Sequence, residues 1–166
     1  MGSGSASIFQ SVANKDIFDF TTGNSDIVSF SDFLILGAGS GTGRGLVLGR
    51  TAQAFFDGRI WNMWFASIGG KCIDAVYVDG IHVVNTAFDS SCTDAFYGQK
   101  ALNTIQALNR IYGMTSSGIS ILEGSNNSLV CNHLDSSGAA NDTTAAIILD
   151  VDAASAKLAG WRGGTQ

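Results

Sequence analysis

The segment HVVNTA, residues 82–87, decides the fold because it recurs along the chain at an almost constant interval. In each copy an asparagine follows apolar residues, and successive asparagines are 23, 24 and 23 residues apart. Two positions before each asparagine is an apolar residue, which in an extended chain points to the same face. The four copies are RIWNMW (59–64), HVVNTA (82–87), ALNRI (107–111) and LVCNHL (129–134), with asparagines Asn62, Asn85, Asn109 and Asn132 and apolar residues Ile60, Val83, Ala107 and Val130.

A repeat of this length is typical of proteins built from stacked structural units. Each repeat contains short apolar alternations of period two and no helical pattern, which predicts stacked strands in a β-solenoid. Equivalent positions in neighbouring rungs would then lie about 4.8 Å apart. We therefore expect the four asparagines to form one column in which each side-chain amide bonds the next, a structural ladder.

A second repeat precedes each asparagine segment and is centred on Asp-Ala. It is clearest in KCIDAVYV (71–78) and SCTDAFYG (91–98), which predicts that Asp74 stacks on Asp94 and Tyr77 on Tyr97. Small and apolar residues alternate in every copy, as they do in a strand with one buried face. The aligned segments are RGLVL (44–48), DAVYV (74–78), DAFYG (94–98), SGISI (117–121) and TAAII (144–148).

The composition supports paired strands and excludes several classes of protein. The 166 residues include 21 glycines and no proline, a residue that removes a hydrogen-bond donor from a sheet. Apolar residues make up 45% and charged residues 14%, which excludes intrinsic disorder. A net charge of −5 argues against nucleic acid or an anionic membrane as partner. The apolar runs, such as FLIL at 33–36, are too short for membrane insertion.

Three longer segments combine these features: FLILGAGSGTGRGLVL (33–48), DGIHVVNTAF (79–88) and GISILEGSNNSLVCNHLD (118–135). They resemble right-handed parallel β-helices of the pectate-lyase-like superfamily, most of all those of bacteriophage tailspikes. The resemblance implies an all-β fold, a right-handed parallel β-helix or solenoid of about five rungs with an N-terminal cap. The expected boundaries are 1–7 for a flexible Gly/Ser leader, 8–30 for the cap, 31–160 for the β-helix and 161–166 for a C-terminal tail.

A tailspike-like module implies recognition of bacterial surface polysaccharide, with cleavage by a glycoside hydrolase or lyase activity left open. It also implies a homotrimer, assembled in the host cytoplasm and located in the virion tail. No cofactor is expected. Two alternatives stay open: a purely structural rod or assembly module of a viral tail or fibre without its own ligand, and a different β-rich viral coat domain.

The candidate catalytic residues are Asp74 and Asp94. Two neighbouring carboxyls can act as general acid and base, because each raises the pKa of the other. Adjacent rungs would match the separation of about 5–5.5 Å found in retaining glycosidases. The alternative is that both aspartates cap turns before a strand. The paired-aspartate signature of polygalacturonase-like hydrolases and the arginine and calcium-carboxylate pattern of pectate lyases do not appear.

The candidate carbohydrate-binding residues are Tyr77 and Tyr97, which the alternation directs outward. Stacked exposed aromatic rings suit a sugar platform, a subunit interface or simple surface packing, and all three stay open. The pair Trp61 and Trp64 is assigned to the core or to an interface rather than to a ligand site.

The cysteines and histidines give no sign of a metal site. Three cysteines, Cys72, Cys92 and Cys131, are an odd number, and they predict free, buried thiols. No CxxC motif occurs, and two separate histidines do not form a zinc pattern, so both are expected to be polar surface residues.

Overall fold

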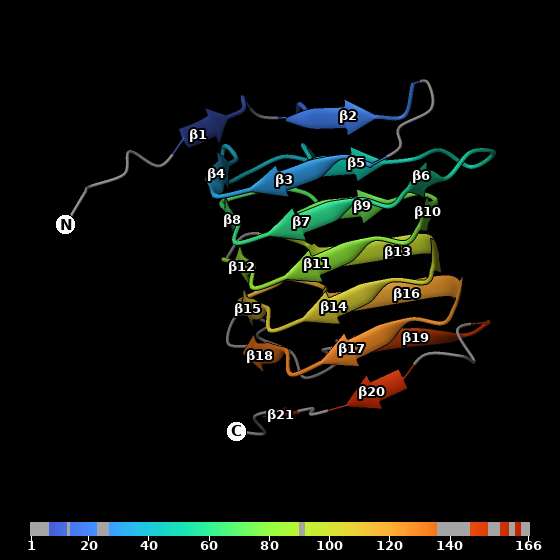
Figure 1. Ribbon diagram of the computed structural model, residues 1–166. Coiled ribbons are helices and arrows are strands. Elements are labelled where there is room, and N and C mark those ends of the chain that lie inside the picture. Colours follow the sequence, from blue (N-terminus) through green and yellow to red (C-terminus); the bar gives the residue numbers. More distant parts are fainter. Residues whose placement is uncertain are drawn as a thin grey trace.

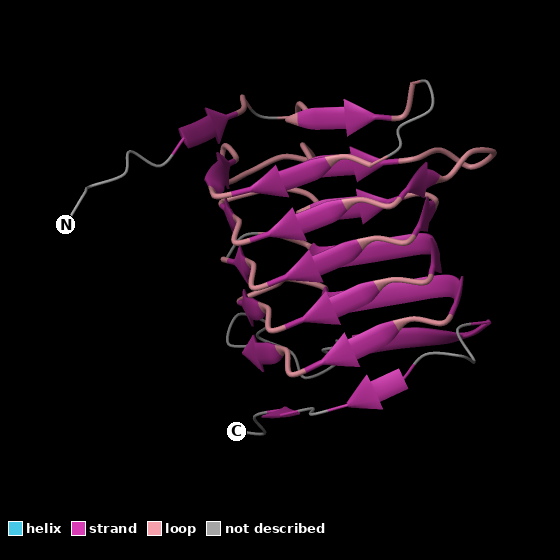
Figure 2. Ribbon diagram, in the orientation of Figure 1, coloured by secondary structure: helices cyan, strands magenta, loops and turns pink. Residues whose placement is uncertain are grey.

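The chain coils in a right-handed sense into a parallel β-solenoid of about five turns (Figure 1). The computed structural model describes residues 7–12, 14–22, 27–89, 92–135, 147–152, 157–159 and 162–163. These residues form strands, turns and loops, and none of them is helical (Figure 2). The predicted all-β parallel solenoid is confirmed. Most of the expected leader, part of the expected tail and residues 144–146 of the TAAII segment lie outside the described residues.

Each turn of the coil places a strand in each of three parallel sheets, named here A, B and C. Sheet A contains β1 (Ser7–Gln10), β4 (Phe33–Leu36), β8 (Trp64–Ala66), β12 (Ala87–Phe88), β15 (Arg110–Tyr112), β18 (His133–Asp135) and β21 (Arg162–Gly163). Sheet B contains β2 (Phe18–Phe20), β5 (Leu46–Leu48), β9 (Ile73–Ala75), β13 (Asp94–Leu102), β16 (Ser117–Ser125) and β19 (Ile147–Asp152), with β6 (Phe55–Phe56) and β10 (Val78–Asp79) beside this path. Sheet C contains β3 (Ser29–Ser31), β7 (Arg59–Trp61), β11 (His82–Val84), β14 (Ile105–Ala107), β17 (Ser128–Val130) and β20 (Lys157–Ala159). In Figure 1 sheet C faces the viewer, sheet B lies behind it and sheet A lies at the left.

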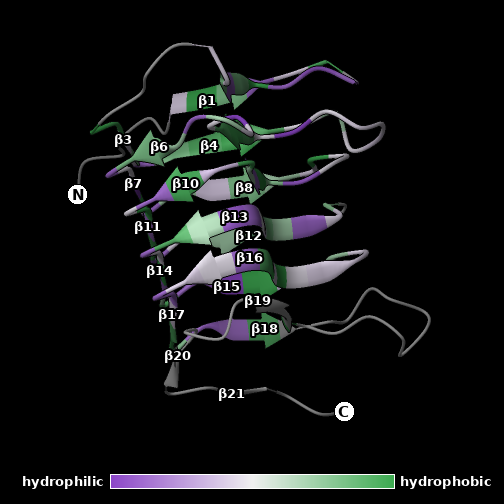
Figure 3. Cartoon of the chain, turned by 90° about the vertical axis from the view of Figure 1, so that its right-hand side faces the viewer, coloured by the Kyte–Doolittle hydropathy of each residue, from purple (hydrophilic) through white to green (hydrophobic). Residues whose placement is uncertain are grey.

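The core is a set of apolar columns that run along the axis of the coil. In β7 the buried Ile60 lies between two exposed residues, and in β8 the buried Phe65 follows the exposed Trp64. Phe65 stacks on Phe88 of the next rung, with ring centroids 5.1 Å apart and an interplanar angle of 14°. Figure 3 shows hydrophobic and hydrophilic residues alternating along the rungs. Each fully buried phenylalanine stabilises the fold by about 1.5–3 kcal/mol, so the columns hold the stack together.

Two corners of the coil place a residue with positive φ in successive rungs. Corner BC, between sheets B and C, contains Ile27, Asp57, Gly80, Asn103 and Asn126, and corner CA, between sheets C and A, contains Asp32, Asn62, Asn85, Leu108 and Cys131. Asparagine and glycine tolerate this left-handed conformation better than most residues do. At Gly80 a Cβ atom would lie 2.5 Å from Oδ1 of Asp57, so glycine suits the position both by its positive φ and by its lack of a side chain. The corners therefore explain why asparagine recurs with the rung period.

The asparagine ladder occupies two columns rather than the single one predicted. Asn85 donates from Nδ2 to Oδ1 of Asn62 at 3.3 Å on the exposed corner CA. Asn109 and Asn132 follow that corner by one residue and are buried, and the backbone N–H of Asn109 donates to Oδ1 of Asn132 at 3.0 Å. The prediction of one column is wrong because the rungs pair with an offset of 23 residues, whereas Asn85 and Asn109 are 24 apart.

The buried asparagines satisfy backbone groups that the turns leave unpaired. Asn109 accepts a hydrogen bond from the N–H of Thr86 at 3.0 Å and donates to the carbonyl of Val83 at 3.0 Å. At corner BC, Asn127 accepts from the N–H of Thr104 at 3.0 Å in the same way. A buried backbone group without a partner costs about 1–3 kcal/mol, so these side chains stabilise the corners.

The repeat centred on Asp-Ala is also shifted from its predicted register. Asp74 of β9 pairs with Tyr97 of β13. KCIDAVYV and SCTDAFYG are 20 residues apart in the sequence, whereas β9 and β13 pair with an offset of 23 residues. The predicted stacking of Asp74 on Asp94 and of Tyr77 on Tyr97 is therefore wrong, although the two segments do lie on adjacent rungs.

The three thiols are free, as predicted, but only two are buried. Cys72 and Cys92 lie in the core, and Cys131 is exposed on corner CA. The prediction of a buried thiol at Cys131 is wrong because the corner directs that side chain to the surface. Burial, together with a hydrogen bond to Cys92, raises the pKa of the Cys72 thiol well above its ordinary value.

The segment expected to cap the stack, residues 8–30, supplies strands of the first rung. β2 pairs in parallel with β5, and β3 pairs with β7, while β1 adds a strand to sheet A beside β4. Phenylalanines of this segment meet edge to face: Phe9 lies 4.9 Å from Phe33 and Phe20 lies 5.4 Å from Phe30, between ring centroids. These rings cover the N-terminal end of the core.

Candidate functional site

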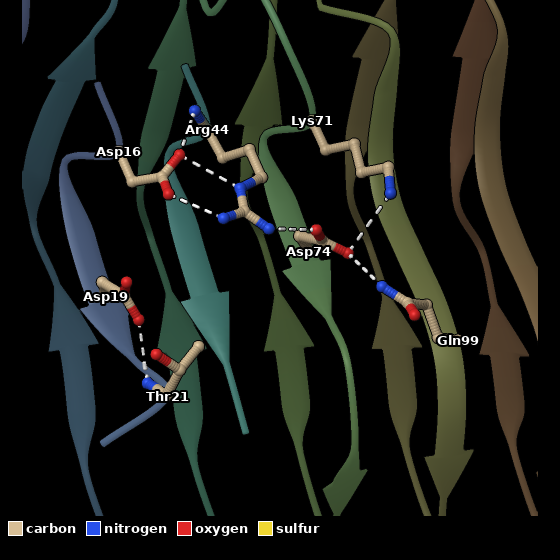
Figure 4. Close-up of polar contacts among 7 residues, drawn as sticks. All are labelled: Asp16, Asp19, Thr21, Arg44, Lys71, Asp74 and Gln99. Carbon is tan, nitrogen blue, oxygen red and sulfur yellow. Dashed lines mark hydrogen bonds and ion pairs between the residues drawn. The ribbon is translucent and has the colours of Figure 1, made fainter. Parts of the chain in front are cut away.

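The outer face of sheet B holds the first predicted site residue, Asp74, in a network of charged side chains (Figure 4). The Asp74 side chain is only 3% exposed, and its Oδ2 accepts a hydrogen bond from Nη1 of Arg44 at 2.7 Å. Its Oδ1 lies 3.4 Å from Nζ of Lys71 and 3.3 Å from Nε2 of Gln99. Arg44 also donates to Asp16 from Nε at 3.0 Å and from Nη2 at 2.7 Å. The network therefore joins four successive rungs.

The ion pair at the start of this network shifts the pKa of both partners. The hydrogen bonds from the Arg44 guanidinium hold the pKa of Asp16 below its ordinary value. The same hydrogen bonds, with those to Asp74, raise the pKa of Arg44.

Asp94 lies further along the same sheet and is also engaged between rungs. Its side chain is buried, and Oδ1 accepts hydrogen bonds from the backbone N–H of Ser117, at 3.3 Å, and from the Ser117 hydroxyl. That hydroxyl is also within hydrogen-bonding distance of the Ser120 hydroxyl. Both serines are buried, so the carboxylate of Asp94 bonds the protein rather than facing solvent.

The two candidate tyrosines each have a lysine over the ring. Nζ of Lys71 lies 3.4 Å from the ring centroid of Tyr97, and Nζ of Lys100 lies 4.6 Å from that of Tyr77. Such cation–π contacts are worth about 0.5–1 kcal/mol at exposed sites. Burial, and to a lesser extent the charge of Asp94, raises the pKa of Tyr97. A sugar ring would compete with a lysine at either tyrosine.

The structure thus brings the predicted site residues to one side of the coil but not into one cavity. Asp74, Asp94, Tyr77 and Tyr97 line none of the hollows described below. The bonds of both aspartates run between rungs, which is how a solenoid holds its turns in register. Their catalytic role, and the role of both tyrosines in binding carbohydrate, stay predictions.

Corner CA carries a groove of about 600 Å³ that runs along the axis of the coil. Four successive rungs contribute equivalent positions to its lining: the corner residues Asp32, Asn62, Asn85 and Leu108, and outward residues of sheet A such as Trp64. Because paired strands are about 4.8 Å apart, the lining from the first to the fourth rung spans roughly 14 Å. The groove therefore presents a chemically repeating wall with the period of the rungs.

This groove combines an aromatic side chain with a row of amide and carboxylate groups. Trp64 is 51% exposed. Asn62 donates to Oδ1 of Asp32 at 2.5 Å, which lowers the pKa of that carboxyl, and Asn85 continues the ladder. The next corner residue is Leu108, which has no donor for Oδ1 of Asn85. An indole face beside a carboxylate, and beside the amide oxygen that Leu108 leaves without a donor, is suited to a ligand that has apolar ring faces and many hydroxyl groups.

A second hollow of about 360 Å³ lies on the other side of Trp64, over the outer face of sheet A. It shares Trp64, Ala87 and Arg110 with the groove. Arg110 donates from Nε to the hydroxyl of Tyr112 at 2.6 Å, and its guanidinium lies 5.2 Å from the centre of that ring. These contacts fix the guanidinium at the boundary between the two hollows.

This groove was not predicted, because Asn62 was expected to be an inward residue of a strand. With Asn62 at a corner, the alternation restarts: Ile60 points inward, Trp61 outward, Met63 inward and Trp64 outward. Trp61 and Trp64 are 55% and 51% exposed, so they do not lie in the core, and the interface expected as the alternative stays a prediction. Because asparagine adopts positive φ readily, an asparagine within an apolar run is the feature of the sequence that could have indicated the corner.

Comparison with protein-family models, with curated proteins and with solved structures gives no match. The structure shows a parallel β-solenoid. No relative supports a pectate-lyase-like or tailspike assignment. Within the described ranges no three or more histidine, cysteine, aspartate or glutamate side chains are placed to hold a metal ion. The same part of the chain has no helix that is long and apolar enough to span a membrane.

Proposed function

We propose that this β-solenoid binds an extended polysaccharide in the groove along corner CA. The observation that carries the proposal is the exposed indole of Trp64 beside the row formed by Asp32, Asn62 and Asn85. A sugar ring can stack on the indole while its hydroxyls donate to the carboxylate and amide oxygens. Each pyranose unit lengthens a polysaccharide by roughly one rung spacing, so about three units fill the groove.

The resemblance of the repeats to phage tailspikes suggests a bacterial surface polysaccharide as the ligand and a virion tail as the place of action. Asp32 is in the groove, and the chain has a net charge of −5. Both features favour a ligand that has no negative charge near Asp32, whereas Arg110, at the opposite end of the groove, bonds Tyr112.

The proposal covers binding and not cleavage. Glycosidases use a pair of carboxyl groups, and Asp32 is the one carboxylate among the described residues that line the groove. Asp74 and Asp94 are occupied by hydrogen bonds between rungs.

A structural rod or assembly module is the second candidate function. It is favoured by the number of side chains that join one rung to the next, such as Arg44, Asn109 and Asn132. A rod needs such bonds and needs no open groove.

The first test is a printed array of bacterial capsular polysaccharides and lipopolysaccharide O-chains, followed by a tryptophan-fluorescence titration with the polysaccharide that binds best. We expect Trp64→Ala to weaken that binding at least tenfold, about 1.4 kcal/mol. The matched control is Phe56→Ala, since Phe56 is an exposed aromatic residue, at 42%, that lies outside the groove. An array without binding, or a Trp64→Ala protein that binds as the wild type does, would contradict the proposal and favour the rod.

We further propose that the chain assembles as a homotrimer, as tailspikes do. Ile8 and Val12, 58% and 71% exposed, leave apolar surface near the N-terminal end of the coil. Large exposed apolar side chains favour association. Light scattering should give three times the chain mass of 17.3 kDa, and a value of one chain mass at micromolar concentration would contradict the trimer.

A further inference from the structure

We infer that the outer face of sheet C holds a second binding site, for a sugar that carries a carboxylate. Arg59 of β7 and His82 of β11 occupy equivalent positions in adjacent rungs. Trp61 and Val84 occupy the next outward positions of the same two strands. These four residues, with Ser29, line a shallow hollow of about 260 Å³. A pair of basic side chains thus lies directly beside an apolar pair.

Arg59 and His82 have no side-chain partner in the part of the chain that the structure describes. Arg59 and His82 make no ion pair or side-chain hydrogen bond with any described residue. By contrast, Arg44 and Lys71 pair with Asp74, and Lys100 pairs with Glu123. In a chain of net charge −5, an arginine and a histidine that are not paired with a carboxylate are available to an anionic ligand.

The spacing of these groups fits an acidic pyranose. Arg59 and Trp61 are two residues apart on one strand and point to the same face, so their Cα atoms are roughly 6.7 Å apart. A sugar ring over the indole of Trp61, which is 55% exposed, would place a carboxylate at its edge near Arg59. A guanidinium presents a fork of donors that matches a carboxylate with two parallel hydrogen bonds. His82 adds a donor from the adjacent rung.

The lining favours a carboxylate over a phosphate. The site supplies one permanently charged group, Arg59, which balances a single negative charge. Asp57 lies with Arg59 and His82 in the adjoining hollow on corner BC and would repel a second charge on the ligand. The site shares no residue with the groove on corner CA, so the two bind independently.

The test is an NMR titration of the ¹⁵N-labelled protein with methyl β-glucuronide, methyl β-glucoside and glucose 6-phosphate. We expect the glucuronide to shift the indole N–H signal of Trp61 along a saturable curve, and the other two sugars to bind at least tenfold more weakly. Arg59→Ala should abolish this tenfold preference for the glucuronide. Arg59→Lys retains the charge but loses the fork, so it should bind several-fold more weakly than the wild type. The control Arg50→Ala removes an exposed arginine that lines neither hollow, and it should bind the glucuronide normally.

Equal binding of glucoside and glucuronide would overturn the site, and so would tighter binding of glucose 6-phosphate. An Arg59→Ala protein that binds as the wild type does would overturn it as well. If the Arg59→Ala spectrum showed loss of the fold, His82→Gln would be the second variant. We expect it to bind the glucuronide more weakly. Unchanged binding would refute the joint role of Arg59 and His82. The glucuronide titration is read at Trp61 and the groove is tested by Trp64→Ala, so failure of the groove leaves this result unaffected.

Discussion

The outer face of sheet B and the groove on corner CA use polar side chains in opposite ways. On sheet B, Asp74 is 3% exposed, and its oxygens are bonded to Arg44, Lys71 and Gln99. On corner CA, Trp64 is 51% exposed, and the amide ladder faces a groove. Both regions have the same rung spacing and similar residue types. A repeating fold therefore offers equivalent outward positions, and burial decides whether they stabilise the stack or remain open to a ligand.

The largest expected effect is on the sheet B network. Asp74→Asn removes the charge that Arg44 and Lys71 share, and we expect the free energy of unfolding to fall by about 3 kcal/mol. Urea denaturation measures it. The matched control is Asp57→Asn on corner BC, where asparagine adopts the positive φ readily, and the change should stay within about 0.5 kcal/mol.

A fully stable Asp74→Asn protein would break the comparison, because the network would then contribute nothing to the stack. Loss of polysaccharide cleavage in such a stable variant would instead support the catalytic role predicted for Asp74. The two outcomes separate a structural carboxylate from a catalytic one.

The next effect compares the buried and exposed columns of the asparagine ladder. Asn109→Ala leaves the N–H of Thr86 and the carbonyl of Val83 without their buried partner, and should cost about 2 kcal/mol. Asn85→Gly preserves the positive φ on the exposed corner and should cost less than about 0.5 kcal/mol. Thermal unfolding of both variants measures the difference. Equal costs would show that the two columns are energetically the same.

The rung period and the fold class could be predicted from the sequence, because apolar alternation and asparagine spacing depend on local geometry alone. The register could not. Asn85 and Asn109 occupy different columns although both follow apolar residues, since asparagine stabilises a corner either by adopting positive φ or by bonding the turn from inside. Asp74 and Asp94 share a local motif, but the pairing of β9 with β13 is fixed by core packing over the whole rung. The groove at Trp64 was missed for the same reason.

A smaller effect concerns acid stability at the start of the sheet B network. Because the folded-state pKa of Asp16 is lowered, its stabilising contribution is present above the unfolded value of about 3.9 and is lost as the pH falls through the folded value. Between about pH 5 and about pH 3, the urea midpoint of the wild type should therefore fall more steeply than that of Asp16→Asn. Asp19→Asn is the control, because Asp19 bonds only the nearby N–H of Thr21 in Figure 4. Identical profiles for Asp16→Asn and the wild type would contradict the role of the ion pair.

The smallest effect on stability is expected at Trp64, although its effect on polysaccharide binding should be the largest. Its indole lies outside the core and is half exposed, so Trp64→Ala should change the free energy of unfolding by less than about 0.5 kcal/mol. The neighbouring Phe65 points inward and stacks on Phe88, and Phe65→Ala should cost about 3–5 kcal/mol. Urea denaturation of both variants tests whether adjacent residues separate recognition from stability in this way. A cost above about 2 kcal/mol for Trp64→Ala would mean that the indole supports the stack, and the groove would then belong with the sheet B face as part of the scaffold.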